Sequence, residues 1–331
     1  MADGLRVAFV GCGAIARSHA EALPAVPALQ LAAVADPDPA ARAAIAGGRV
    51  PAFASLDELL AARLPLHAAL VLTPPHLHEP QAARLLAAGL HVLCEKPLVP
   101  TAAAAERLFA VARAADRRLV LASKFRHGAD VAAARALLAE AAIGPLRRYE
   151  NVFAGRVAMA GRWQADPLRS GGGVLMDNGP HVADLARCLL GPLARVAATC
   201  PPPAPGLVVE DTVHLQFTSA AGVLGTADLS WRVPFAQPWY VRLSGDDGAI
   251  ELGWQQSRWR RHDADWQVLG RGYDKRAAFA ALLADFAAAC TGTRAPSPTA
   301  DDAAAAVRFV AAAYRAAQSG TWCDVGDATL P

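Results

Sequence analysis

The stretch Leu5-Arg-Val-Ala-Phe-Val10-Gly11-Cys-Gly13-Ala-Ile-Ala16 decides the fold of this chain. It joins a short apolar run to the pattern Gly-x-Gly-x-x-Ala and then to a helical pattern, which is the context that a dinucleotide-binding turn requires. Glycines let the backbone approach a pyrophosphate, and the free N–H groups and dipole of the following helix favour the anion. We therefore predict that a dinucleotide contacts Gly11, Gly13, Ala14, Ile15 and Ala16.

A carboxylate follows at the position that such a turn predicts. The apolar run 29–35 ends at Asp36, about 20 residues beyond the turn, where a carboxylate can accept hydrogen bonds from ribose hydroxyls. The same charge repels a 2′-phosphate, and Pro37-Asp38-Pro39 offers no arginine to bind one. The expected cofactor is therefore NAD, and the nearby Arg42 keeps NADP as the less favoured alternative.

Outward from the turn, short apolar runs alternate with helical patterns through the first half of the chain. The runs cover residues 5–10, 29–35, 68–72, 91–94 and 119–122, and the intervening helices cover roughly 14–24, 76–88 and 101–116. Strand, helix and strand at this spacing predict a doubly wound parallel sheet of the α/β class. We assign it to an NAD-binding domain over residues 1–123.

The pattern changes from about residue 128, which predicts a second α/β domain over residues 124–331. Apolar and polar residues alternate in 211–217, and polar side chains take one face of 223–232. These strands predict a sheet with one apolar and one wetter face. The other expected elements are a helix at 128–141, an irregular segment at 154–170 and two alanine-rich helices at 275–290 and 301–317. The C-terminal helix could pack back on the first domain.

The composition limits the kind of partner. The 331 residues are 54% hydrophobic and carry 32 basic against 30 acidic side chains, a net charge of +2. Without a charge run, neither nucleic acid nor a membrane surface is expected as a partner, which leaves a small molecule. No apolar stretch approaches about 18 residues, so we expect a cytoplasmic protein. The six cysteines never form C-x-x-C, so neither a disulfide framework nor a metal site is expected.

Two further motifs follow apolar runs, at the carboxyl ends of strands where open α/β sheets bind ligands. They are Thr73-Pro-Pro-His-Leu-His78 and Glu95-Lys96-Pro97. Their residues expected at the cofactor are Thr73, Pro74, His78, Glu95 and Lys96. For His76 and His78, a purely scaffolding role is an equal alternative.

Lys96 stands out because only three of the 32 basic residues are lysines, the others being Lys124 and Lys275. A peptide bond before proline can be cis, which would turn the Lys96 ammonium toward the crevice. The alternative is a surface ion pair with Glu95.

A triple glycine, Gly171-Gly-Gly173, is predicted to open a helix that carries Asp177 and His181. Residues four apart share one helix face, so both side chains could reach one ligand. Histidine can move a proton near neutral pH, and Asp177 could orient it or hold a substrate hydroxyl. Pro180 removes a backbone hydrogen bond between them, so we expect a kink that makes this geometry approximate.

Taken in order, these motifs resemble the Gfo/Idh/MocA oxidoreductase family, of the glucose-fructose oxidoreductase and inositol dehydrogenase type, over nearly the whole chain. The resemblance implies a Rossmann domain, an α/β domain with an open, mostly antiparallel sheet, and NAD(P)-dependent oxidation of sugars, polyols or their derivatives. It implies that Lys96, Asp177 and His181 are catalytic, and that the sheet forms a homodimer or homotetramer. The chain departs from the family at Pro75, where an asparagine often follows Thr-Pro.

Cationic side chains raise the question of an anionic substrate. Ser123-Lys124-Phe-Arg126 ends the last strand of the first domain, where similar proteins often contact substrate. Together with Arg162 and Arg169, Lys124 and Arg126 suggest a uronate or a sugar phosphate. The alternative is that some of these side chains simply face water. Trp163 is expected either to cover an apolar sugar face or to belong to the core.

The expected activity is that of an NAD-dependent dehydrogenase acting on a substrate CH–OH in the crevice between the domains. His181 would accept the hydroxyl proton as hydride leaves, Lys96 would donate to the same oxygen, and Asp177 would fix His181. Lys96, Asp177 and His181 would thus also bind substrate, with Lys124, Arg126 and Trp163 around them. One alternative is an NAD-dependent glycosidase or epimerase that oxidises its substrate transiently. Another is a regulator that senses NAD(H) without turnover.

Overall fold

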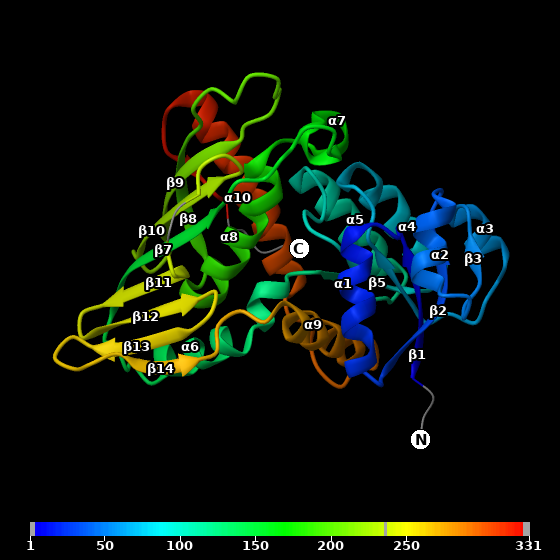
Figure 1. The fold of residues 1–331 in the computed structure, drawn as a ribbon, viewed down its shortest axis with the longest axis horizontal. Helices are drawn as coiled ribbons and strands as arrows, with labels where there is room; N and C mark the ends of the chain where they lie inside the picture. The colour runs from blue at the N-terminus through cyan, green and yellow to red at the C-terminus, as the bar shows by residue number, and fades with distance from the viewer. Residues whose placement is uncertain (1–3, 235–236, 327–331) are drawn as a thin grey trace. The chain divides into compact units, whose positions relative to one another are not determined.

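The computed structural model describes residues 4–234 and 237–326. The chain forms two compact units, each described by itself (Figure 1). Of the described residues, the first unit comprises 4–124 and 279–303, and the second comprises 125–234, 237–278 and 304–326.

The first unit is built on a six-stranded sheet in the order β3-β2-β1-β4-β5-β6, in which every neighbouring pair is parallel. The strands are β1 (Leu5–Val10), β2 (Leu29–Ala35), β3 (Ala52–Phe53), β4 (Ala68–Val71), β5 (His91–Cys94) and β6 (Leu119–Leu121). This confirms the predicted doubly wound parallel sheet. The strand order reverses beside β1, and ligands of such sheets bind outside the carboxyl ends of the strands at this point.

Five α-helices alternate with the strands of this sheet in sequence, and a sixth, α9, comes from much later in the chain; two of the six were not predicted. They are α1 (Ala14–Ala22), α2 (Pro39–Ala46), α3 (Leu56–Ala61), α4 (His78–Ala87), α5 (Ala102–Ala114) and α9 (Lys275–Cys290). The unpredicted helices are α2 and α3, which are short and begin at side-chain caps: the Asp38 carboxylate accepts from Ala40 N, and the Ser55 hydroxyl accepts from Glu58 N.

The core of the first unit joins residues far apart in sequence. Val7 and Phe9 of β1 are fully buried in one apolar cluster with Phe279, Leu283 and Phe286 of α9. The late helix therefore completes the hydrophobic core around the first strand.

The second unit is built on a nine-stranded sheet in the order β14-β13-β12-β11-β7-β10-β9-β8-β15. The strands are β7 (Leu146–Ala154), β8 (Leu193–Thr199), β9 (Thr212–Ser219), β10 (Leu224–Ser230), β11 (Trp239–Gly245), β12 (Gly248–Gly253), β13 (Ser257–Arg261), β14 (Gln267–Gly270) and β15 (Cys323–Asp324). Only β7 and β10 pair in parallel, and the remaining pairs are antiparallel among the described strands. The mostly antiparallel sheet expected from the family resemblance is thereby confirmed.

Helices cover one face of this sheet (Figure 1). The helices of this part of the chain are α6 (Ala129–Ala139), α7 (Pro167–Ser170), α8 (Val174–Leu190) and α10 (Ala300–Ser319). Tyr149 of β7, Phe217 of β9 and Phe309 of α10 are fully buried in one core. On the other face Thr212 bonds to Ser230 at 2.9 Å and His214 to Asp228 at 2.8 Å, so that face is polar, as the alternation predicted.

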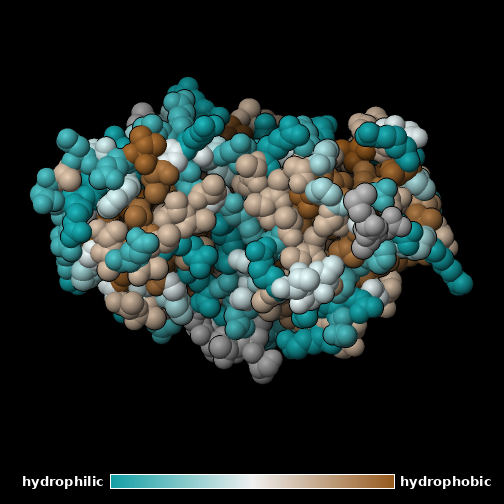
Figure 2. All heavy atoms as spheres, turned by 90° about the horizontal axis from the view of Figure 1, so that it is seen from below, coloured by the Kyte–Doolittle hydropathy of each residue, from teal (hydrophilic) through white to brown (hydrophobic). Residues whose placement is uncertain are grey.

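Hydrophilic and hydrophobic residues are interspersed on the face drawn in Figure 2. Among the large apolar side chains, Trp254 and Trp322 are exposed to 42% and 40%. Within residues 4–234 and 237–326, no helix has the length and apolar character needed to cross a membrane.

Candidate active site

In the turn after β1, the backbone at Gly11 packs closely against the chain that follows β4. Gly11 has φ +94°, and a Cβ there would lie 2.8 Å from the carbonyl carbon of Leu72. Gly13 is the N-cap of α1, and no described heavy atom, its own neighbours aside, lies within 4 Å of a Cβ built on it. The nine-residue helix α1 therefore begins at an open, exposed N-terminus. Such an end offers N–H donors and room for a diphosphate.

Asp36 lies against this turn. Its Oδ2 accepts from Cys12 N at 2.6 Å, and its Oδ1 accepts from Asp38 N at 2.8 Å. Arg42 Nη1 donates to the main-chain oxygens of Asp36 and Pro37 at 3.0 and 3.1 Å. The carboxylate is thus fixed at the end of β2. Burial and the Asp36 charge raise the pKa of the Cys12 thiol to about 12, so it is not a nucleophile at neutral pH.

His78 is part of the scaffold around the next two motifs. Its ring is fully buried, with Nε2 2.7 Å from the Thr73 carbonyl oxygen and Nδ1 2.8 Å from that of Pro97. Burial lowers the pKa of His78. The ring therefore ties the chain after β4 to the chain after β5. His76 is exposed, and the Thr73 hydroxyl donates to Gln81 Oε1 at 2.6 Å.

Glu95 is buried behind Lys96, and the Lys96–Pro97 bond is cis. His19 Nε2 lies 2.9 Å from Glu95 Oε1, and Lys96 N donates to Glu95 Oε2 at 3.2 Å. Burial would raise the pKa of Glu95, but the His19 hydrogen bond and the charges of Lys124 and Lys96 bring it below its ordinary value. The Glu95 carboxylate is therefore a buried charge that contacts the His19 ring and the Lys96 backbone N–H, and it does not lie at the surface.

The cluster around Glu95 includes a histidine that the sequence analysis missed. The His19 ring lies edge-on to Phe279, with centroids 4.7 Å apart, and Lys124 Nζ is 5.6 Å from the centroid of the same Phe279 ring. His19 Nδ1 has no hydrogen-bond partner within the described chain. In the sequence, His19 is visible only as a polar residue on the apolar face of α1. Its role could not be predicted because that role depends on contact with Glu95, which is distant in sequence.

Asp177 and His181 both lie on α8, which runs without interruption from Val174 to Leu190 through Pro180. The two residues are therefore four positions apart on one continuous helix, as the spacing predicted. Asp177 is half-buried and His181 is 6% exposed. The His181 ring meets Phe125 edge-on at 4.9 Å, beside a cluster of aromatic rings. The other members of this cluster are Phe153, Tyr240, Trp254 and Tyr273.

The triple glycine has a packing role at the start of α8. A Cβ on Gly173 would lie 2.0 Å from the Glu210 carbonyl oxygen, and one on Gly172 would lie 2.0 Å from the Tyr314 hydroxyl. Glu210 Oε1 accepts from Gly173 N at 2.9 Å and from Leu175 N at 3.1 Å. A carboxylate here also complements the helix dipole. Glu210 therefore positions the helix, and no motif pointed to it.

The remaining predicted substrate residues lie in the second unit, apart from Lys124. Arg126 Nε donates to Asp184 Oδ1 at 2.9 Å, and both side chains are buried. Trp163 is half-buried at the start of a short helix, η4 (Trp163–Ala165), while Arg162 and Arg169 are exposed on the same segment. The charge of Arg126 is thus compensated inside the protein.

The candidate residues fall into two groups. The dinucleotide turn and the Glu95 cluster belong to the first unit, and α8 with its aromatic cluster belongs to the second. Within the residues that the structure describes, no group of three histidine, cysteine, aspartate or glutamate side chains could hold a metal ion.

Both halves of the chain match family models. Residues 5–123 match the GFO/IDH/MocA model described as an oxidoreductase family with an NAD-binding Rossmann fold, and residues 131–251 match the GFO/IDH/MocA C-terminal domain.

Curated relatives are similar over much of the chain. The dTDP-3,4-didehydro-2,6-dideoxy-alpha-D-glucose 3-reductase of Streptomyces violaceoruber is 34% identical, over 75% of this chain and 72% of its own length. The rhizopine catabolism protein MocA of Rhizobium meliloti is 27% identical over 93% of both chains. This chain matches only part of other curated relatives: 53% of the length of a putative UDP-kanosamine synthase oxidoreductase subunit of Amycolatopsis mediterranei and 42% of the length of an uncharacterized oxidoreductase of Schizosaccharomyces pombe.

Among solved structures, GenD2 from gentamicin A biosynthesis in complex with NAD superposes with a TM-score of 0.85. It is 28% identical, and the superposition covers 98% of this chain and 97% of that one.

Proposed function

Because the chain belongs to the Gfo/Idh/MocA oxidoreductase family, we propose that it is an NAD-dependent dehydrogenase that oxidises a CH–OH group of a sugar, polyol or sugar derivative. The observation that carries the proposal is the fixed Asp36 carboxylate beside the open N-terminus of α1. Relatives named as a sugar-nucleotide reductase and a rhizopine catabolism protein support a sugar-related substrate.

The residues of the turn fit NAD. The space above Gly13 would receive the pyrophosphate against the N-terminus of α1, and the Asp36 carboxylate would accept hydrogen bonds from the ribose hydroxyls. A 2′-phosphate would meet the same negative charge, which favours NAD over NADP. When bound, the nicotinamide supplies the hydride acceptor.

In the proposed mechanism, side chains of this protein accept the proton of the substrate hydroxyl and stabilise the charge on its oxygen. The His181 ring accepts the proton of the substrate hydroxyl, as a positioned general base. The Lys96 ammonium donates a hydrogen bond to the same oxygen, and Asp177 holds a neighbouring hydroxyl or orients His181. Glu95, fixed by His19, holds the backbone of Lys96 in place.

The proposal is tested by NADH formation at 340 nm with a panel of polyols, aldoses, uronates and sugar phosphates, using NAD and NADP separately. We expect turnover with at least one free sugar or polyol. Conversion of glycosides without net NADH would instead favour transient oxidation. Tight NAD binding without turnover on the whole panel would favour a sensor.

We further propose that the polar face of the sheet around β9 and β10 pairs with a second copy of the chain, to give a homodimer or homotetramer. Its support is the polar surface there, which includes the His214–Asp228 pair at 2.8 Å. Light scattering after gel filtration measures the subunit number, and a monomeric mass at micromolar concentration would contradict this proposal.

A further inference from the structure

The short helix η3 (Lys124–His127) contacts the helix that carries His181 through two consecutive side chains. The Phe125 ring lies edge-on to the His181 ring, with centroids 4.9 Å apart and planes at 81°. Arg126 Nε donates to Asp184 Oδ1 at 2.9 Å and to Asp184 Oδ2 at 3.1 Å. His181 and Asp184 are three positions apart on α8, so they are neighbours on its surface. The two contacts therefore join one turn of η3 to one turn of α8.

The Arg126–Asp184 pair is enclosed and directional. The two side chains are only 6% and 2% exposed, and a second guanidinium nitrogen, Arg126 Nη2, also donates to Asp184 Oδ1. A guanidinium that donates through two nitrogens has one favourable orientation toward the carboxylate. Since apolar pairs often give a protein interior similar stability, the specific contribution of this ion pair is to fix where η3 lies along α8.

Other aromatic rings hold Phe125 on its remaining sides. Phe125 is 6% exposed, and its ring stacks on that of Tyr273 with centroids 4.6 Å apart and planes at 30°. The Phe153 ring lies 4.9 Å from it, and Tyr273 N donates to the Gly253 carbonyl oxygen at 3.1 Å. Protein interiors are close-packed, so the Phe125 ring has little freedom to move. It therefore presents a fixed surface to His181.

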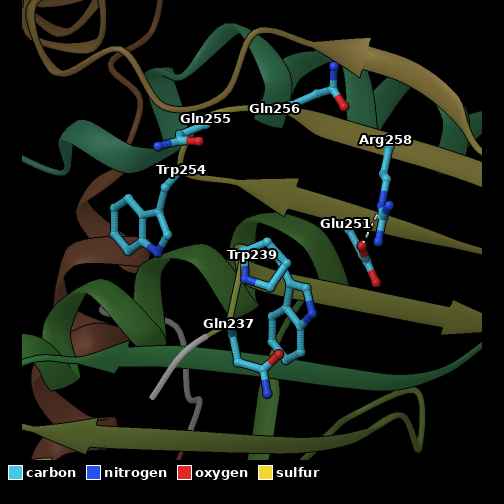
Figure 3. Close-up of a pocket in the computed structure, with 8 residues that line it drawn as sticks. Gln237, Trp239, Glu251, Trp254, Gln255, Gln256 and Arg258 are labelled. Atoms are coloured by element: carbon cyan, nitrogen blue, oxygen red, sulfur yellow. Dashed lines mark hydrogen bonds and ion pairs between the residues drawn. The ribbon is translucent and has the colours of Figure 1, made fainter. Parts of the chain in front are cut away.

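Trp254 forms the outer end of this group of rings. Its ring centroid lies 6.4 Å from that of Phe125 and 4.9 Å from that of Tyr240. Figure 3 shows Trp254 beside a hollow of about 380 Å³ that Trp239 also lines. Trp254 is 42% exposed, whereas Phe125 and Tyr240 are buried. The rings between the hollow and His181 are therefore core, which can orient His181 but cannot admit a ligand to it.

The orientation of the His181 ring matters for the proposed reaction. A general base must bring one ring nitrogen within hydrogen-bond distance of the hydroxyl group. Because the reacting atoms must be aligned, a displacement of about 1 Å can lower a rate by about 100-fold. Helix α8 places the Cα atom of His181, but the ring can still turn about its side-chain bonds. A perpendicular ring on a fixed support restricts that rotation.

We propose that Phe125 and Arg126 are positioning residues for His181. Arg126 fixes η3 against α8 through Asp184, and Phe125 fixes the plane of the His181 ring. This inference rests on the proposed function, because it takes His181 as the general base. It gives Arg126 a role in place of the substrate contact that was expected from the sequence.

Phe125→Leu and Phe125→Tyr test the ring contact. Leucine removes the flat face and should lower kcat about tenfold or more with KM for NAD unchanged, whereas tyrosine keeps the face and should retain most of kcat. Phe217→Leu is the matched control, because Phe217 is a buried ring of the same core that contacts the rings of Tyr149 and Phe309. It should lower Tm about as much as Phe125→Leu but leave kcat within about twofold.

The order of the His181 ring is measured without turnover. Histidine labelled with carbon-13 gives an NMR order parameter for each imidazole, and His181→Gln identifies the His181 signal. We expect this order parameter to fall in Phe125→Leu and to stay unchanged in Phe217→Leu. An unchanged order parameter in Phe125→Leu would overturn the inference. A loosened ring with full kcat would also overturn it, because the orientation of the ring would then not matter to the reaction.

The double variant Arg126→Leu with Asp184→Leu tests the second contact. It should fold, because it leaves no buried charge unpaired. We expect kcat to fall about tenfold with KM for the sugar unchanged, since positioning is lost and binding is not. A raised KM with normal kcat would show that Arg126 contacts substrate, and normal values of both would show that the pair is purely structural. Either result overturns the role of Arg126.

Failure of the proposed function gives a different result. If the wild-type protein forms no NADH with any substrate of the panel, the dehydrogenase proposal fails, while the order parameter of His181 still decides whether Phe125 orients the ring. If the wild-type protein turns over and the order parameter does not depend on Phe125, the positioning inference alone fails.

Discussion

The Tyr314 hydroxyl donates to Glu210 Oε1 at 2.7 Å, and the same oxygen receives the first backbone N–H groups of α8. Burial and the Glu210 charge raise the pKa of Tyr314, so its hydroxyl remains a donor at every ordinary pH. A side chain of α10 thus fixes the carboxylate that caps the helix carrying Asp177 and His181.

Tyr314→Phe is expected to lower the free energy of unfolding by about 1.5–3 kcal/mol, since it removes a buried hydrogen bond to a charged group. It should also lower kcat more than it raises KM, because Asp177 lies in the first turn of the helix. Urea denaturation and steady-state kinetics measure the two effects. Tyr149→Phe is the matched control, since the buried Tyr149 hydroxyl has no hydrogen-bond partner in the described chain. Equal effects of both substitutions would contradict the positioning role.

His181→Ala and Lys96→Met are each expected to lower kcat by about 100-fold or more, the usual contribution of a positioned acid or base. NAD affinity should stay nearly unchanged, because neither substitution removes the turn or Asp36. The measurement is NADH formation combined with NAD titration. Lys275→Met changes the only lysine without a proposed role and should leave kcat intact. Losses below about threefold in both variants would remove the catalytic assignment.

Asp36→Ser is expected to raise KM for NAD by about tenfold and to improve the relative use of NADP, because it removes the negative charge at the ribose. Adding Arg42→Met should cancel the NADP gain if the guanidinium, which lies at the Asp36 and Pro37 carbonyls, contacts the phosphate. The ratio of kcat/KM for the two cofactors is the measurement. An unchanged ratio in Asp36→Ser would argue against ribose binding at this position.

Lys124→Met tests whether the substrate carries an anionic group. If it does, KM for a uronate or sugar phosphate should rise about tenfold while KM for the matching neutral sugar stays constant. Arg126→Met is unsuitable for this purpose, because it would leave the buried Asp184 carboxylate without its guanidinium. That variant should instead lose about 3–5 kcal/mol of stability. An unchanged KM for the uronate or sugar phosphate in Lys124→Met would exclude a contact between Lys124 and an anionic group.

Stability should fall in mild acid. The pKa of buried His78 lies below its ordinary 6.5, so the unfolded chain binds a proton where the folded chain does not, and the free energy of unfolding decreases as pH drops below about 6.5. Burial also lowers the pKa of His91, so this histidine likewise reduces the free energy of unfolding as the pH falls. Glu95, whose pKa is also lowered, adds a further loss as pH falls below about 4.5.

Thermal unfolding between pH 8 and pH 5 measures this dependence. His78→Gln should flatten the upper part of the profile, even though the variant starts from a lower Tm. His76→Gln, at an exposed ring two residues earlier, is the control and should leave the profile unchanged. A wild-type Tm that stays constant from pH 7.5 to pH 5.5 would contradict the role of His78.

Much of this fold could be predicted from the sequence, because each main strand of the first sheet is a short apolar run that can be recognised locally. Apolar runs such as 29–35 and 91–94 coincide with β2 and β5, since strands buried on both faces read as continuous hydrophobic segments. The strands from Trp239 to Gly270 were not predicted, because their arginines and tryptophans pair across strands, as Arg258 does with Glu251. Such pairing is invisible without the register.

The candidate site was predictable where one helix or one turn carries it, as with Asp177 and His181 on α8. It was not predictable where contacts join distant segments. His19 acquires its role from Glu95, 76 residues away, and Glu210 acquires its role from Gly173, 37 residues away. Arg126 was expected to contact substrate, but its guanidinium donates to the buried Asp184 carboxylate, 58 residues away.

The placement of α9 in the core of the first unit sets the order in which this protein can fold during synthesis. Val7 and Phe9 leave the ribosome early, but Phe279 and Phe286, which pack with them, are made only after most of the second unit. Domains usually fold as they are made, from the N-terminus onward. Here the core of the first unit stays incomplete until α9 has been synthesised. A nascent chain stalled before residue 279 should therefore expose apolar surface that chaperones bind.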